Sequence, residues 1–142
     1  MHVDYGLIVG KSRNSILNFL KNLQQTYVLK IKKCPTQHLG YTFVWKSDDY
    51  LFIHQSDFIH KILKNFDMVD ANPVKASLPL NFHCVMAFNL PPFDVKVMRR
   101  DIGMLNYLAL NTCPDITFTV NVIFQFASSP TQAHWSMVKH LM

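Results

Sequence analysis

The sequence predicts an α+β fold in which short strands and one helix come first and helices alone follow. Two observations carry this prediction. Apolar residues alternate with period two in parts of residues 1–55, whereas they recur every three or four residues in most of residues 56–142. A chain of 142 residues fits one ordinary domain or two small subdomains, and it buries roughly 70% of its extended surface on folding.

The first part of the chain combines short strands with one helix. Val3 and residues 7–9 predict two short strands broken near Gly6, because glycine permits the positive φ of a tight turn. Ser12 is the expected N-cap of a helix. One apolar stripe marks this helix: Ile16, Phe19, Leu20, Leu23 and Tyr27. Residues 27–32 then change toward period two and predict a further strand.

The clearest hairpin signal is LGYTFVWKSDDYLFIHQ, which covers residues 39–55. Two β-branched and aromatic runs flank the turn-forming residues 47–49. Ser56 follows as the expected N-cap of a helix, with Asp57 favourable in its first turn. The apolar stripe of this helix is Ile59, Ile62, Leu63 and Phe66.

Residues 67–94 are rich in proline and asparagine and show no sustained periodicity, which predicts a long connection. Three helices are expected beyond it, the second opened by Pro114 and the third by Pro130 and Thr131. Their stripes are, in order, Ile102, Leu105, Leu108 and Ala109; Ile116, Val120, Ile123, Phe124 and Ala127; and Trp135, Val138 and Leu141. The sequence thus divides into a mixed part, 1–55, and a helical part, 56–142.

Composition narrows the classes of function. No apolar run approaches the ~18 to 20 residues of a membrane span, and no signal peptide is recognisable, so we expect no membrane partner and an intracellular, non-secreted chain. Cys34, Cys84 and Cys113 are odd in number and far apart, which favours reduced thiols in the cytoplasm or nucleus. The spacing of cysteines and histidines matches no zinc motif, and we expect no structural zinc.

The net charge of +5 is concentrated in residues 1–66, which hold nine lysines and arginines against four aspartates. Such an excess of positive charge favours a surface that binds a polyanion. The alternative is that these lysines are ordinary solvated surface residues. Lys61 and Lys64 lie one turn apart on a predicted helix and could contact the phosphates of a duplex.

Several segments, taken in order, resemble the reverse transcriptase of Ty1/copia-type retrotransposons. They are HVDYGLIVG, HLGYTFVW, LFIHQSDFIHKILKNFDM, NPVKASLPL and DIGMLNYLALNTCPDITFTVNVIFQFASSPTQAHWSMVKHLM. The resemblance covers essentially the whole chain. It implies that residues 1–55 are part of a polymerase palm, with a degenerate metal-binding hairpin and a primer-grip-like hairpin, and that residues 56–142 are a helical thumb with a long loop at about 67–94.

The resemblance also implies roles for individual residues. Asp4 matches the first aspartate of the pair that holds Mg²⁺, and Lys30 matches a lysine proposed as general acid for the departing pyrophosphate. Residues Leu39, Gly40 and Tyr41 belong to the hairpin that grips the primer terminus of an RNA–DNA or DNA duplex.

One departure from the family pattern weakens the catalytic expectation. Tyr5 stands in place of the second aspartate, and one carboxylate of three should bind Mg²⁺ too weakly to organise a triphosphate. The upstream palm and fingers and the downstream RNase H region are expected as missing partners. We therefore expect a fragment of an RNA-directed DNA polymerase that performs no nucleotidyl transfer by itself. The alternatives are a non-catalytic nucleic-acid-binding module and a decayed retroelement product with no selected role.

Overall fold

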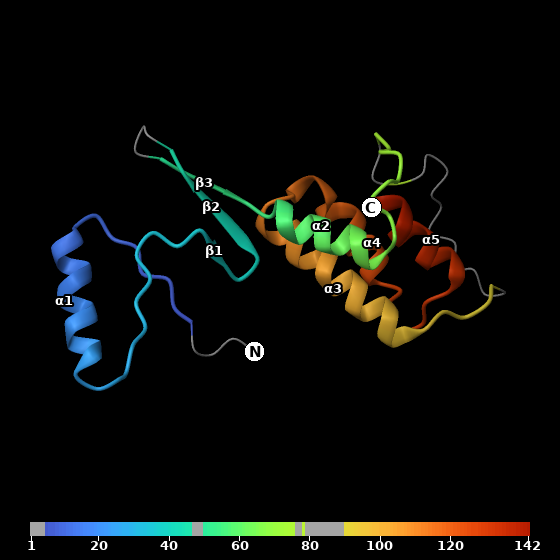
Figure 1. Cartoon of the computed structure of the whole chain (residues 1–142). Helices are drawn as coiled ribbons and strands as arrows, with labels where there is room; N and C mark the ends of the chain where they lie inside the picture. Colours follow the sequence, from blue (N-terminus) through green and yellow to red (C-terminus); the bar gives the residue numbers. More distant parts are fainter. Residues whose placement is uncertain (1–4, 47–49, 76–77, 79–89) are drawn as a thin grey trace.

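The computed structural model describes residues 5–46, 50–75, 78 and 90–142. It confirms the α+β prediction, with a small antiparallel sheet and a group of helices (Figure 1). The elements in chain order are α1 Arg13–Gln24, β1 Gln37–His38, β2 Tyr41–Trp45, β3 Leu51–His54, α2 Ser56–Asn65, α3 Val95–Asn111, the 3₁₀ helix η1 Pro114–Ile116, α4 Thr117–Phe124 and α5 Gln132–Leu141.

The sheet has the strand order β1-β2-β3, and both pairs are antiparallel. Strands β2 and β3 form the hairpin predicted at 39–55, with Phe43 opposite Ile53, while its turn at 47–49 lies outside the described residues. Sequence reasoning missed β1. Leu39 and Gly40 join β1 to β2 with φ of 46° and 83°. A two-residue connection with both φ values positive is the turn that matches the twist of a β-hairpin.

The hydrophobic core lies among the helices of the second half. The buried positions of α3 include all four residues of its predicted stripe, and α2 adds Ile62 at 2% exposure. Val120 and Ile123 of α4 and Val138 of α5 complete the core as predicted, whereas Phe124 is 53% exposed. The core residues are Ile62, Met98, Ile102, Leu105, Leu108, Ala109, Val120, Ile123, Ala127, Met137 and Val138.

Helix α1 forms where the sequence predicts it, but none of its residues is buried. The Ser12 hydroxyl accepts a hydrogen bond from the Ser15 N–H, as expected for an N-cap. Phe19 of the predicted stripe is 51% exposed. Figure 1 shows α1 at one end of the molecule, with the sheet between it and the core helices. Ile16, Leu20 and Leu23 are only half-buried, so the stripe is incompletely covered among the described residues.

Two predicted strands are absent, and the start of α2 is shifted. Residues 7–9 and 27–32 are not strands, while Val3 lies outside the described residues. Alternation alone does not make a strand, because strand propensity depends on a neighbouring strand and a half-buried surface. Helix α2 begins at Ser56 with Gln55 as its N-cap. The Ser56 N–H donates to His54 Nδ1, and no side chain caps the helix in the way predicted for the serine hydroxyl.

The long connection predicted at 67–94 contains no helix or strand element over its described residues, 67–75, 78 and 90–94. Its end is attached to the start of α5. The Phe93 N–H donates to the Pro130 carbonyl at 2.9 Å, and the Gln132 N–H donates to the Pro91 carbonyl at 3.0 Å. The chain therefore enters α3 from a fixed point beside α5.

One carboxylate lies inside the helical core. Asp101 has 0% exposure, and its Oδ1 accepts a hydrogen bond of 2.7 Å from Nε of Arg100, which raises the pKa of that guanidinium. Oδ2 of Asp101 is buried and has no hydrogen-bond partner among the residues that the structure describes. A buried charge with one partner adds little net stability, so the apolar contacts hold this part of the fold together.

Helix α5 starts with a capping box made by Thr131 and His134. Nδ1 of His134 accepts the Thr131 N–H at 3.0 Å, so this nitrogen carries no proton. The ring is 5% exposed and stacks on Phe126 with a centroid distance of 4.1 Å. Burial lowers the pKa of His134 below its ordinary value of 6.5. The folded state thus prefers the neutral ring.

We expect the protein to lose stability as the pH falls below about 6.5 because of His134. Its folded pKa is lowered, so the unfolded chain binds the proton first and stability decreases until the folded pKa is passed. Urea unfolding between pH 7.5 and 5 measures this loss. His134→Gln keeps an acceptor for the helix cap and should flatten the dependence of the unfolding free energy on pH. The control His60→Gln, on the exposed side of α2, should leave that dependence unchanged. An equal slope in the wild type and His134→Gln would contradict the assignment.

Candidate nucleic-acid interface

The candidate interface consists of the β2–β3 hairpin and helix α2, which follow each other directly in the chain. Gln55 alone separates β3 from α2. One carboxylate also joins the two elements in space. Oδ2 of Asp57, in the first turn of α2, accepts hydrogen bonds from Gln37 Nε2 at 2.9 Å and from Thr42 Oγ1 at 3.1 Å. The start of the helix is thus tied to both β1 and β2.

The predicted residues Leu39, Gly40 and Tyr41 lie together at the base of the hairpin, against α3. The Tyr107 hydroxyl donates to the Leu39 carbonyl at 2.6 Å, and the Tyr41 hydroxyl donates to Oδ1 of Asn111. A Cβ at Gly40 would lie 3.8 Å from the rings of Phe58 and Tyr107. The hydroxyl of Tyr41 is thus engaged within the protein, while the Leu39 side chain is 45% exposed.

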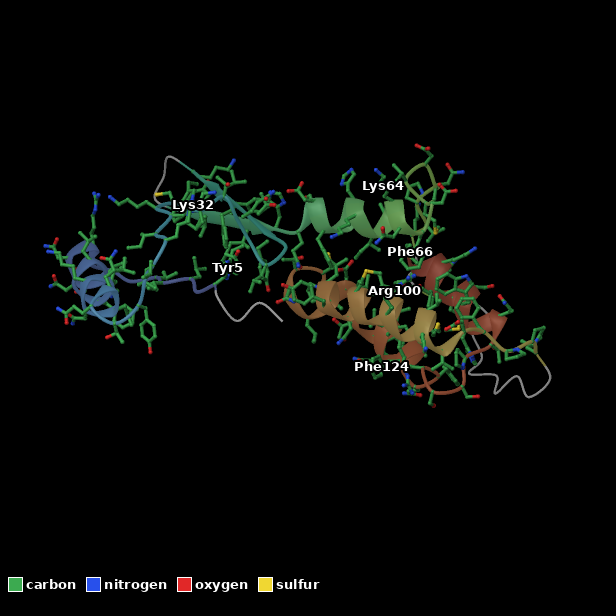
Figure 2. All side chains as sticks on the ribbon, turned by 60° about the horizontal axis from the view of Figure 1, so that its bottom comes forward. Tyr5, Lys32, Lys64, Phe66, Arg100 and Phe124 are labelled. Carbon is green, nitrogen blue, oxygen red and sulfur yellow. The ribbon has the colours of Figure 1, made fainter. Side chains whose placement is uncertain are left out.

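Lys61 and Lys64 are exposed on α2, as the sequence predicted. The intervening Ile62 is buried against the other helices, so α2 has one core-facing side and one solvent side. Figure 2 shows Lys64 at the edge of α2 and Phe66 toward the remaining helices. The same view places Lys32 far from Lys64, near the sheet, so the positive charges do not form one compact cluster.

Of the two residues given catalytic roles by the family resemblance, the structure describes only Lys30. Asp4 lies outside the described residues. Lys30 is exposed in the coil between α1 and β1, because the strand predicted there does not form. Tyr5, beside Asp4, is 70% exposed. Over the part of the chain that the structure describes, no three His, Cys, Asp or Glu side chains lie close enough to hold a metal ion.

Sequence reasoning missed the polar residues that attach the hairpin to the helices. Besides Tyr107 and Asn111, the Thr112 hydroxyl donates to Oε1 of Gln55 at 2.8 Å. Burial, with smaller contributions from the neighbouring Tyr41, raises the pKa of Tyr107 above its ordinary value. A tyrosine hydroxyl is protonated at neutral pH in any case, so it is available as a donor. The available signal was the polar pair Tyr107 and Asn111, four residues apart near the end of a helix.

Comparison with known proteins finds similarity to retroelement sequences. No protein-family model and no solved structure matches it. Its whole length is similar to segments of retrovirus-related Pol polyproteins from transposons. One is the Pol polyprotein from transposon TNT 1-94 of Nicotiana tabacum, 29% identical, and another is that from transposon RE1 of Arabidopsis thaliana, 28% identical. An uncharacterized mitochondrial protein of Arabidopsis thaliana is 32% identical over the full chain.

The chain spans 11% of the TNT 1-94 polyprotein, 10% of the RE1 polyprotein and 58% of the mitochondrial protein. The expected resemblance to a retrotransposon Pol region is therefore confirmed at the level of the polyprotein, and the similarity supports a Pol-derived segment. Among the described residues, no helix combines the length and the apolar character needed to cross a membrane.

Proposed function

We propose that this chain is the palm–thumb portion of a retrotransposon reverse transcriptase, which contacts a primer–template duplex and does not perform nucleotidyl transfer by itself. The observation that carries the proposal is the direct junction of the hairpin with α2, whose solvent side presents Lys61 and Lys64. Full-length similarity to transposon Pol polyproteins supports the same assignment.

The chemistry of this surface suits a nucleic-acid backbone. The two lysines are three residues apart, about one helical turn, so both ammonium groups can reach successive phosphates of one strand. Lysine acts there as a point charge and gives no base specificity. The exposed Leu39, in the turn between β1 and β2, adds an apolar contact near the start of α2. Such a surface would bind a duplex by its backbone and not by its sequence.

Within this proposal, Asp4 is the remaining ligand of a degenerate Mg²⁺ site and Lys30 is the matching general acid. Mg²⁺ requires several oxygen ligands near octahedral geometry, and Tyr5 offers a phenol where the family has a carboxylate. The described residues provide no cluster that would replace the lost ligands.

The first half of the chain needs a covering partner. In its described residues, Phe43 is the only buried large apolar side chain, at 6% exposure. Helix α1 exposes Phe19, and β3 exposes Phe52 and Ile53 at an outer strand of the sheet. Unpaired apolar edges associate readily with other chains. We assign the covering role to the remaining palm and fingers of the Pol polyprotein, with RNase H further downstream.

Binding to a primer–template duplex should depend on salt through Lys61 and Lys64. Titration of a fluorescent duplex at several salt concentrations should give a steep loss of affinity for the wild type. The double variant Lys61→Ala/Lys64→Ala should reduce the slope of log affinity against log salt by about 1.8, since each lost phosphate contact removes about 0.9.

The matched control is Lys96→Ala/Lys139→Ala, which removes the same charge from exposed positions of α3 and α5. Equal slopes for the two double variants would show general charge attraction and contradict the assignment of α2. No binding at low salt would refute the proposed function. The same preparations, given nucleotides and Mg²⁺, should show no templated extension above the background, and extension abolished by Asp4→Ala would overturn the inactivity.

A further inference from the structure

Residues at the end of α3 contact the hairpin at two places. One is the turn between β1 and β2, and the other is Gln55, directly after β3. At the turn that begins β2, Tyr107 bonds to the Leu39 carbonyl and Asn111 bonds to Tyr41. At the exit of β3, Thr112 bonds to Gln55. We name Tyr107, Asn111 and Thr112 the hairpin clamp.

We propose that the hairpin clamp sets the orientation of the β2–β3 hairpin relative to the helical core, with Tyr107 as its main positioning residue. This inference deepens the proposed function, because a primer–template bound along the hairpin and α2 would meet a fixed angle between them. The register pairs Thr42 with His54, so the two attachments lie at the same end of the hairpin, one at the start of β2 and one directly after β3. Attachment on both strands restricts rotation of the hairpin more than either attachment alone.

Few other contacts can hold this angle. Phe43 is the one buried apolar residue of β2 and β3. The Phe58 and Tyr107 rings meet edge to face at 5.4 Å, and the Tyr41 and Tyr107 rings lie 6.3 Å apart. Asp57 adds hydrogen bonds from α2 to Gln37 and Thr42, which are exposed to competition by water. The hairpin is therefore positioned by polar attachments together with the ring contacts of Tyr107, and not by a buried apolar core of its own.

The attachment at Gln55 is also easily lost. Gln55 is 1% exposed, and its Nε2 is buried without a hydrogen-bond partner among the described residues. A buried amide that lacks one bond already carries a desolvation cost. Its Oε1 bond to Thr112 is thus the remaining polar interaction of this side chain. Removing that bond should favour release of the hairpin exit from α3.

Backbone NMR of the full chain in a weakly aligning medium tests the clamp. In the wild type, residual dipolar couplings of the hairpin and of α3 should fit one common alignment tensor. Tyr107→Phe keeps the ring and removes only the hydroxyl, and Thr112→Val removes the second attachment at similar volume. Each variant should reduce the residual dipolar couplings of the hairpin, so that the hairpin and α3 no longer fit one alignment tensor. The couplings of α3–α5 should stay as in the wild type.

The matched control is Tyr50→Phe, which removes a hydroxyl from the 57% exposed side chain beside β3 and should change nothing. Duplex affinity should fall up to about fivefold in Tyr107→Phe, equivalent to one hydrogen bond. If the hairpin couplings of both clamp variants still fit the same alignment tensor as α3, the proposed role of the clamp is contradicted, even if the duplex binds. Loss of the common tensor in the clamp variants supports the proposed role of the clamp. If the wild type binds no duplex in the same experiments, only the proposed function is contradicted.

Discussion

Replacing Ile102 with alanine is expected to lower the free energy of unfolding by about 2 to 4 kcal/mol. Ile102 is 1% exposed in the middle of α3, within the core shared by α2, α3, α4 and α5. The loss combines the transfer free energy of the removed methyl and methylene groups with the cavity that remains. Urea unfolding followed by circular dichroism measures the change, provided that the denaturant slope is the same in both proteins.

Leu110→Ala is the matched control, because Leu110 lies on the same helix and is 69% exposed. It should change the unfolding free energy by less than about 0.5 kcal/mol. Similar losses for the two variants would mean that this face of α3 is not the core. A broad, non-cooperative transition in the wild type would instead support a decayed product without a defined fold.

Replacing Trp135 with alanine should cost about 3 kcal/mol, the lower end of the range for large aromatic residues, because Trp135 is only partly buried. Its ring stacks on Phe93 at 4.6 Å with an interplanar angle of 13° and contacts Phe66 at 5.5 Å. The three rings join the end of α2, the entry to α3 and helix α5. The variant should therefore also detach the segment that precedes α3 from the start of α5, which the amide signal of Phe93 reports.

The control for this prediction is Lys139→Met. The ammonium of Lys139 lies 6.0 Å from the Trp135 ring centroid, at the limit of a cation–π contact. In this exposed position its loss should cost about 0.5 kcal/mol or less. If Lys139→Met is as damaging as Trp135→Ala, the charge and not the aromatic stack holds the segment.

The helices could be predicted where the partner of each apolar stripe is present in the same chain. The stripe of α3 was read correctly because Ile102 and Leu105 meet α4 and α5 within the described fold. Helix α1 was predicted as an element, since its N-cap and spacing are local signals, yet its burial was not. Residues 27–32 alternate as a strand does, but no strand pairs with them, and Val28 is fully exposed. Local pattern predicts an element only when tertiary contacts agree with it.

The candidate site was also predictable only where local sequence pattern determines it. Exposure of Lys61 and Lys64 followed from the helical spacing around Ile62. The hairpin clamp could not be predicted, because Tyr107 reaches the Leu39 carbonyl across 68 positions of sequence, and no local pattern encodes such a contact. The turn at Leu39 was missed because leucine is rare at positive φ, which here measures 46°.

The concentration of the core in the second half has a practical consequence for measurement. A calorimetric or optical melt is dominated by the part that exposes buried apolar surface on heating, which here means α2 to α5. Amide hydrogen exchange would resolve the two parts separately, with slow exchange in α3 and fast exchange in α1. A high melting temperature would therefore say little about whether the surface that meets a duplex is correctly formed.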